Sequence, residues 1–302
     1  MNKWILLILL VVIWFGAGLA VFANINAPVE TVAAEYSQPQ RIVSLAPNLT
    51  EILFALGLEE RIVGVTQFSN YPPDAEKVNK VGTFWAPNLE AVIATKPDLL
   101  VTIDTQQQTT IARRLSRIGY NALTFDIRKV DQLFDAITKI GAATATDAKA
   151  AEMITDIKSK LSDLSALVKT VNPPKVLWVV QREPLRVAGK DTFVTEMIEL
   201  AGGRNAVSST IHQYPPIGPE QVIACRPDVI IEPAMHPGRL ESQRETALRY
   251  WSKSQFENVP AVVNGRIYVI DGDLVSRLGS RFYQAVEKIA RCMNPQLFQA
   301  EK

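Results

Sequence analysis

Four aromatic residues in loop-like segments are the side chains of this sequence best suited to binding chemistry. Tyr71, Phe84, Trp85 and Tyr214 all lie in stretches rich in proline and glycine, rather than in an apolar helical stripe. Aromatic residues in loops are more often functional than those on a helix face. Because an aromatic ring offers a broad apolar surface at a low entropic cost, these four predict a site for a large, flat ligand. The alternative is that each ring packs beneath its own loop.

None of the catalytic or nucleotide-binding sequence motifs that we considered accompanies these aromatic residues. G-x-S-x-G, P-loop, H-E-x-x-H and glycine-rich dinucleotide patterns are all absent. The two cysteines, Cys225 and Cys292, have no histidine at ligand spacing, so a zinc site is not expected. In an oxidising compartment the two thiols could pair, and the alternative is that both stay free. We therefore predict a binding protein without catalytic residues, metal or resident cofactor.

Two sequence motifs each occur twice in the chain, and they indicate the helices and strands that position these loops. EAVIATKPDLLV at 90–101 matches EQVIACRPDVII at 220–231, and TEILFALG at 50–57 matches TEMIELAG at 195–202. The copies lie much farther apart than the repeats of a solenoid. In each copy of the longer motif a short helix stops at a proline, and an apolar strand follows the aspartate. The repeat predicts two lobes of similar topology.

Alternating strands and helices predict an α/β fold with mostly parallel sheets in both lobes. Continuous apolar runs predict strands at 41–45, 62–65, 99–103, 122–125, 176–180, 229–231 and 267–270. Helices are expected at 50–56, 109–119, 130–144, 192–201 and 279–292. We assign residues 40–145 to an N-terminal lobe and residues 174–302 to a C-terminal lobe.

One long helix is predicted between the lobes, within residues 146–173. Apolar residues recur there at spacings of three and four, at Met153, Ile154, Ile157, Leu161, Leu164 and Val168. Thr146 and Asp147 suit the N-cap, and Pro173 ends the helix. Because no glycine or proline interrupts the segment, we expect a rigid connector that limits hinge closure. The alternative is an ordinary core helix of a single domain.

An unbroken apolar stretch near the N-terminus predicts export of the chain. It runs from Trp4 to Ala23, directly after Lys3, and has no polar face. Val21 and Ala23 are small enough for signal-peptidase cleavage after Ala23, whereas the length of the run also suits an uncleaved anchor. No cysteine follows, which argues against a lipoprotein. We assign residues 1–23 to a signal peptide or membrane anchor and residues 24–39 to a tether.

The charge balance argues against a nucleic acid as partner. Lys and Arg number 32 against 31 Asp and Glu, and no run of like charge occurs. Nucleic-acid binding would need a basic surface. The hydrophobic content of 47% is that of a globular protein, and 302 residues are enough for two lobes. We expect the chain to act as a monomer.

Several of these segments resemble the periplasmic binding proteins of ABC importers whose lobes are joined by one long helix. RIVSLAPNLTEILFALG at 41–57 is similar throughout that class, which binds corrinoids, ferric siderophores or haem. SNYPPDAEKVNKVGTFWAPNLEAVIATKPDLL at 69–100 and QYPPIGPEQVIACRPDVII at 213–231 resemble the branch that binds cobalamin (vitamin B12). The resemblance runs from Arg41 to Cys292. It implies a periplasmic or otherwise extracytoplasmic receptor that captures a corrinoid between its lobes and delivers it to a membrane permease.

The resemblance also implies ligand-binding roles for five residues, namely Tyr71, Phe84, Tyr214, Asp273 and Arg277. The three aromatics match residues that face the ligand, and Phe84 and Tyr214 stand where the family has tryptophan. Asp273 and Arg277 match polar residues that hold amide groups of the ligand. Trp85 is a sixth candidate, because it adds an aromatic ring next to Phe84. The family's cysteine partner of Cys292 is Ala201 here, so Cys225 is the candidate that is left for a disulfide.

Glu90 and Glu220 occupy matching places at the start of the repeated helix, one in each lobe. A carboxylate in a first helical turn complements the helix dipole whatever the function of the protein. The resemblance implies a second role, in which each glutamate pairs with an arginine of the ABC permease dimer. Exposed charges of this kind orient docking more than they add affinity.

Three alternatives stay open at this level. A ferric siderophore would call for cationic side chains at the cleft, and the candidates are Arg182, Arg186, Arg277 and Arg281. Haem would need an axial ligand, and the candidates are His212, His236, Tyr71 and Tyr214. A membrane-anchored sensor or interaction domain is the alternative from another functional class, which an uncleaved N-terminal anchor would favour.

Overall fold

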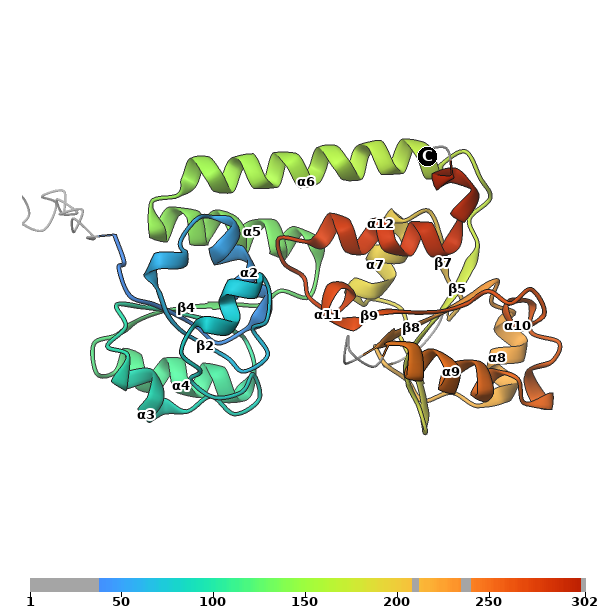
Figure 1. Ribbon diagram of the computed structural model, residues 1–302, viewed down its shortest axis with the longest axis horizontal. Helices are drawn as coiled ribbons and strands as arrows, with labels where there is room; N and C mark the ends of the chain where they lie inside the picture. The colour runs from blue at the N-terminus through green and yellow to red at the C-terminus, as the bar shows by residue number, and fades with distance from the viewer. Residues whose placement is uncertain (1–37, 208–211, 235–239, 300–302) are drawn as a thin grey trace, which may run out of the picture. The chain divides into compact units, whose positions relative to one another are not determined.

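A computed structural model of the chain describes residues 38–207, 212–234 and 240–299 (Figure 1). Residues from Gln38 onward form one compact unit. The predicted signal peptide or anchor at 1–23, nearly all of the tether at 24–39, and His236 lie outside the described residues. In the three described ranges, no helix combines the length and apolar character that crossing a bilayer requires.

The N-terminal lobe is built on a four-stranded parallel sheet with the strand order β2-β1-β3-β4. Its strands are β1 (Ile42–Ser44), β2 (Ile62–Val65), β3 (Leu99–Ile103) and β4 (Asn121–Phe125). Its helices are α2 (Pro47–Ala55), α3 (Leu89–Ala94), α4 (Gln106–Ser116) and α5 (Val130–Thr144). The central strands β1 and β3 are almost wholly buried, which explains why their sequences are continuously apolar.

The C-terminal lobe has a second, mostly parallel sheet with the order β6-β5-β8-β9, and β7 also pairs with β5. Its strands are β5 (Lys175–Arg182), β6 (Leu185–Val187), β7 (Arg204–Asn205), β8 (Val229–Ala234) and β9 (Ile267–Asp271). Its helices are α7 (Phe193–Leu200), α8 (Pro219–Cys225), α9 (Leu240–Trp251), α10 (Pro260–Val263), α11 (Gly272–Val275) and α12 (Phe282–Met293). Only the β5–β6 pair is antiparallel among the described strands. The predicted α/β class with mostly parallel sheets is confirmed.

The repeated motif folds in the same way in both lobes. It forms α3 and β3 in the first copy and α8 and β8 in the second. Lys96 and Arg226 follow these helices, each with a left-handed φ of 47°. The Asp98 carboxylate accepts a hydrogen bond of 2.9 Å from a backbone N–H at the start of the neighbouring strand, and Asp228 accepts one of 2.8 Å in the same way. Each aspartate therefore fastens β1 or β5 to the motif, which is a structural reason for the repeat.

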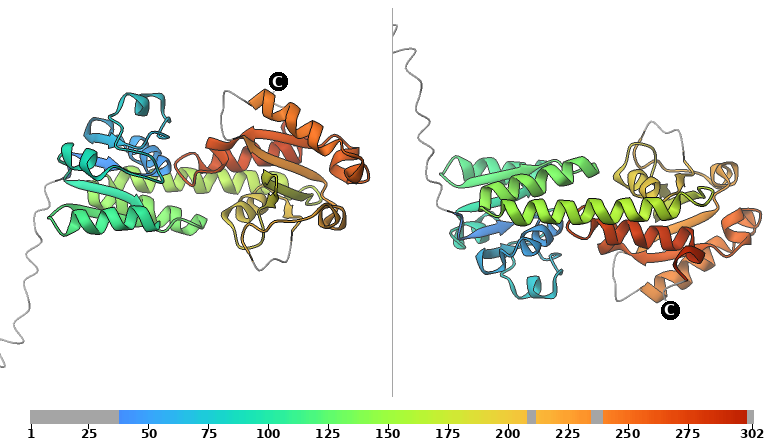
Figure 2. Two further views of the ribbon diagram at one scale, coloured as in Figure 1. Left: turned by 90° about the horizontal axis from the view of Figure 1, so that it is seen from below. Right: turned by 90° about the horizontal axis from the view of Figure 1, so that it is seen from above.

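The long helix α6 (Asp147–Val168) lies within the segment predicted for it. It runs beside α5 and α12, and so along both lobes (Figures 1 and 2). Its buried residues recur at helical spacing, at Ala150, Ile157, Leu161, Leu164 and Val168. A Cβ at Gly141 of α5 would lie 2.6 Å from the Cβ of Ala150, so glycine permits this close approach. That α6 limits hinge closure stays a prediction.

The lobes also share a hydrophobic core, which the sequence analysis did not foresee. One cluster of buried residues includes Ile42 and Val101 of the first sheet and Val176 and Ile231 of the second. Residues of α6 and α12 belong to the same cluster. Hydrogen bonds also join the lobes directly, from Asn48 to the carbonyl of Leu278 and from Ser280 to the carbonyl of Glu51, so α6 is not their only connection.

Candidate functional site

A cavity of about 500 Å³ is lined by residues of both lobes. Phe68, Phe84 and Trp85 contribute aromatic side chains from the N-terminal lobe. Phe193 adds an aromatic ring from α7, and Asp273 and Arg277 add charged groups from the C-terminal lobe. Aromatic walls with a few placed polar groups are typical of sites for large organic ligands.

A tight loop holds Phe84 and Trp85 at this cavity. Gly82 has a φ of 107°, and a Cβ there would lie 2.6 Å from a backbone nitrogen, so the turn requires glycine. The amide of the buried Gln108 donates a 3.0 Å hydrogen bond to the carbonyl of Phe84. The two rings meet edge to face, with centroids 4.7 Å apart. Trp85 is 67% exposed, so it has a free surface for a ligand.

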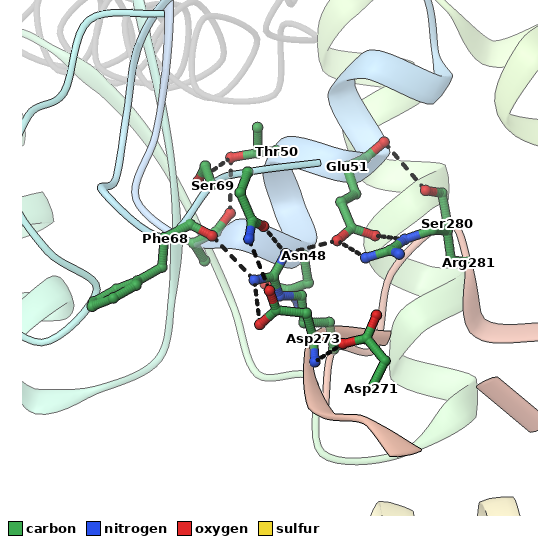
Figure 3. A network of polar contacts seen from close by, with 12 residues as sticks. Asn48, Thr50, Glu51, Phe68, Ser69, Asp271, Asp273, Ser280 and Arg281 are labelled. Atoms are coloured by element: carbon green, nitrogen blue, oxygen red, sulfur yellow. Dashed lines mark hydrogen bonds and ion pairs between the residues drawn. The ribbon is translucent and has the colours of Figure 1, made fainter. Parts of the chain in front are cut away.

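Charged and amide groups from both lobes form one polar network (Figure 3), and Asn70, Asp273 and Arg277 of this network line the cavity. Nη1 of Arg277 donates to Oε1 of Glu51 at 3.1 Å and to Oδ1 of Asn70 at 2.8 Å. Its Nη2 donates to the carbonyl of Phe68 at 3.1 Å and pairs with Oδ1 of Asp273 at 2.8 Å. Since Glu51, Phe68 and Asn70 belong to the N-terminal lobe, Arg277 joins the two lobes.

Glu51 is the buried centre of this network, with a side chain that is only 1% exposed. Besides Arg277, it accepts hydrogen bonds from Nε and Nη2 of Arg281 at 2.9 and 2.7 Å. Burial alone would lower the pKa of Arg281, but the hydrogen bonds and the charge of Glu51 raise it. Among the described residues, the network balances the carboxylates of Glu51 and Asp273 with two guanidinium groups.

The two tyrosines predicted to face the ligand lie elsewhere. Tyr71 lines a second cavity, of about 750 Å³, where the guanidinium carbon of Arg281 lies 3.7 Å from the centre of its ring. Tyr214 packs against the main hydrophobic cluster, and its burial raises the pKa of its hydroxyl. Neither tyrosine lines the 500 Å³ cavity, whereas the other predicted ligand-binding residues, Phe84, Trp85, Asp273 and Arg277, all do.

Nine of the described lining residues are not among the predicted ligand-binding residues, and they include Asn48, Phe68, Asn70 and Phe193. Asn48 precedes Thr50 by two residues, and Phe193 precedes Thr195 by two, so they hold matching positions in the shorter repeat. The two residues differ in type, so the repeat does not by itself identify either of them. Asn70 immediately precedes Tyr71 in the segment already singled out, and Phe68 lies just before the start of that segment.

Glu90 and Glu220 are exposed on the first turns of α3 and α8. Other side chains supply the hydrogen bonds that cap these helices. Asn88 accepts from the backbone N–H of Ala91 at 2.9 Å, and Gln221 accepts from that of Gly218 at 2.9 Å. The helix ends therefore do not depend on the two glutamates for capping, and the docking role stays a prediction.

Of the four arginines considered for a siderophore, only Arg277 lines the 500 Å³ cavity. Arg281 lies at the second cavity, and Arg182 lies 3.4 Å from the carboxylate of Glu232. Arg186 donates a hydrogen bond of 3.2 Å to the carbonyl of Tyr214.

Both cysteines are free thiols in the structure. Cys292 is buried in the main cluster, and burial raises the pKa of its thiol to about 11. Cys225 is half-buried against a different cluster, in the C-terminal lobe. His212, a candidate haem ligand, is exposed. In the described part of the chain, no group of three or more His, Cys, Asp or Glu side chains could hold a metal ion.

Comparison with known proteins gives a consistent family relationship. The family model described as "Periplasmic binding protein" matches residues 42–274. An uncharacterized ABC transporter substrate-binding lipoprotein of Bacillus subtilis is 31% identical over 268 residues, which are 86% of this chain and 82% of that protein. The vitamin B12-binding protein of Vibrio cholerae is 26% identical over 252 residues, covering 83% and 87%. The solved structure of the periplasmic heme-binding protein RhuT from Roseiflexus sp. RS-1 has a TM-score of 0.75 and 27% identity, covering 85% of this chain and 99% of RhuT.

Proposed function

Since this chain belongs to the periplasmic binding protein family, we propose that the ligand it captures for its ABC importer is a corrinoid such as cobalamin. Family membership makes the chain an extracytoplasmic substrate-binding component that serves a permease, and not an enzyme. The observation that carries the choice of ligand is the 500 Å³ cavity, which has aromatic rings from both lobes and an Asp–Arg pair at one edge. The vitamin B12-binding relative supports the same choice.

The side chains at the cavity favour a corrinoid over haem. Haem iron in proteins is held by an axial His, Cys, Met or Tyr. Among the described residues that line the cavity, none belongs to these four types. A corrinoid carries its own axial ligands on cobalt, so it places no such demand on the protein. Haem is the alternative that the likeness to RhuT favours.

The charge at the cavity also favours a corrinoid over an anionic ferric siderophore. Arg277 is the only cationic side chain among the described lining residues, and Asp273 and Glu51 neutralise it. An anionic ligand would have to compete with these carboxylates for the guanidinium group. A ligand that is rimmed by uncharged amides can use Asp273 as an acceptor and Arg277 as a donor without adding charge.

Spectral titration of the purified protein with cyanocobalamin, haemin and a ferric hydroxamate tests the choice of ligand. We expect saturable binding of cyanocobalamin, weakened roughly tenfold by Phe84→Ala, because an aromatic contact contributes about 1 kcal/mol beyond its area. Phe298→Ala is the matched control, since this ring packs under Arg291 and does not line the cavity. Binding of only the iron compounds would overturn the choice of a corrinoid.

We further propose that Glu90 and Glu220 dock the loaded protein on the permease. A Glu90→Ala/Glu220→Ala double variant should bind ligand normally and fail to support uptake in cells. The control is Glu152→Ala/Glu245→Ala, which removes the same charge from exposed sites on α6 and α9. Normal uptake by the first double variant would exclude the docking role.

A further inference from the structure

The side-chain amide of Asn70 is held by two charged residues of the opposite lobe. Its Nδ2 donates to Oδ2 of Asp273 at 2.8 Å, and its Oδ1 accepts from Nη1 of Arg277 at 2.8 Å. The side chains of Asp273 and Arg277 are only 25% and 10% exposed, so these hydrogen bonds form in a partly desolvated place. Hydrogen bonds to charged partners are roughly twice as strong as neutral ones. All three residues line the 500 Å³ cavity.

Asn48 shows that an amide at this cavity does not need charged partners. Its Nδ2 also reaches the opposite lobe, where it donates to the backbone carbonyl of Leu278 at 3.0 Å. Asn70, in contrast, presents one end of its amide to a carboxylate and the other end to a guanidinium group. The Asp273–Arg277 pair therefore binds both the donor and the acceptor of a single carboxamide.

We propose that Asn70 stands in for a primary carboxamide of the ligand, so that ligand binding exchanges the chain's own amide for one from the ligand. The inference rests on the proposed function, because a corrinoid is rimmed by amides of this kind. A ligand amide offers the same N–H donor and carbonyl acceptor as Asn70. The exchange therefore conserves both charge-assisted hydrogen bonds, and Asn70 acts as an internal competitor that lowers the apparent affinity.

The same pair selects carboxamides against carboxylates. A ligand carboxylate could accept from Arg277 but would have no proton to share with Asp273. It would also lie close to Glu51, whose Oε1 is 3.1 Å from Nη1 of Arg277. Like charges in a partly buried site are unfavourable, and an acceptor facing an acceptor leaves Asp273 without its donor. Asp273 is therefore the residue that sets the preference for an amide.

Titration of wild type and Asn70→Ala with cyanocobalamin and with a corrinoid in which one peripheral amide has been hydrolysed to a carboxylate tests the exchange. We expect Asn70→Ala to bind cyanocobalamin at least about tenfold more tightly, because the two hydrogen bonds of Asn70 no longer have to be broken when the ligand binds. We expect wild type to prefer the amide form and Asp273→Asn to lose most of that preference.

Glu196→Ala is the control for a general loosening of the lobes. Glu196 of α7 accepts a hydrogen bond of 2.9 Å from the backbone N–H of Val130 between the lobes, and neither residue lines the cavity. Tighter binding by both Asn70→Ala and Glu196→Ala would overturn the exchange in favour of loosening. Unchanged or weaker binding by Asn70→Ala would overturn it while leaving the corrinoid in place. Absence of corrinoid binding by wild type and by every variant would instead overturn the proposed function.

Discussion

Replacing Glu51 by glutamine should destabilise the protein strongly, because this carboxylate neutralises two guanidinium groups that water barely reaches. The side chains of Arg277 and Arg281 are 10% and 13% exposed, and that of Glu51 is 1% exposed. Glutamine has nearly the same shape, but it removes the negative charge. It also turns an amide N–H₂ toward groups that can only donate.

The structure allows the size of the effect to be estimated. Glu51 accepts hydrogen bonds of 3.1, 2.9 and 2.7 Å from the two arginines. Removing one partner of a buried ionic network typically costs about 3–5 kcal/mol, because the remaining charges stay buried without compensation. Asp273 still pairs with Arg277 in the variant, so we expect the lower half of that range, about 3–4 kcal/mol. For a chain of this size the midpoint of thermal unfolding should fall by roughly 10 °C.

Urea-induced unfolding, followed by tryptophan fluorescence, measures this loss. The control is Glu90→Gln, which makes the same chemical change at an exposed site and should alter the free energy of unfolding by less than about 0.5 kcal/mol. The comparison requires equal m-values, so that the change reflects stability alone. A loss below about 1 kcal/mol for Glu51→Gln at an unchanged m-value would refute the view that this network fastens the lobes together.

Three further outcomes follow from groups outside the cavity. Burial raises the pKa of Glu232, although a hydrogen bond from Trp251 and the charge of Arg182 oppose the shift. A carboxyl group with a raised pKa stabilises the folded protein fully at a pH below its unfolded-state pKa of about 4.5. This stabilisation is lost as the pH rises through the higher pKa of the folded state. Wild type should therefore lose stability relative to Glu232→Gln over that interval, and parallel urea curves would contradict this. In the native protein only Cys225 should react with a thiol reagent, because Cys292 is buried. Both cysteines should react in denaturant. A disulfide detected by mass spectrometry would contradict this prediction. Asp98→Ala should cost about 0.5–1.5 kcal/mol in unfolding experiments, because water replaces only part of the two exposed hydrogen bonds that Asp98 accepts from backbone N–H groups near β1.

Much of the fold could be predicted because its signals are local in the sequence. The bounds of α5, β2 and β3 agree with the prediction to the residue, since their apolar patterns have sharp ends. Helix α9 was missed because it is mostly polar and buries only Ala247 and Trp251. Strand β6 was missed because it is three residues long and pairs in an antiparallel hairpin with β5. Its place depends on that partner more than on its own composition.

The candidate site could be predicted only in part, and the reason is distance along the chain. Phe84 and Trp85 could be predicted because Gly82 and Pro87 mark a loop around them, and aromatic residues in loops are more often functional than those on a helix face. Tyr71 lies at the second cavity, where its ring contacts Arg281 of the other lobe. Because these two residues are far apart in the sequence, no local pattern distinguishes the direction of Tyr71 from that of Phe84.

The amino-acid sequence by itself determined the two-lobed α/β architecture, the long connecting helix and the repeat that puts one exposed glutamate on each lobe. Hydrophobic periodicity and helix-stopping residues are local patterns, and a repeat is found by comparing two stretches of sequence. All three can therefore be recognised without knowledge of any tertiary contact. Only the tertiary structure decided that Asn70 meets Arg277, and that Glu51 meets Arg281, across more than 200 residues of chain. Such hydrogen bonds depend on where the two lobes bring their side chains together, and no local pattern specifies that place.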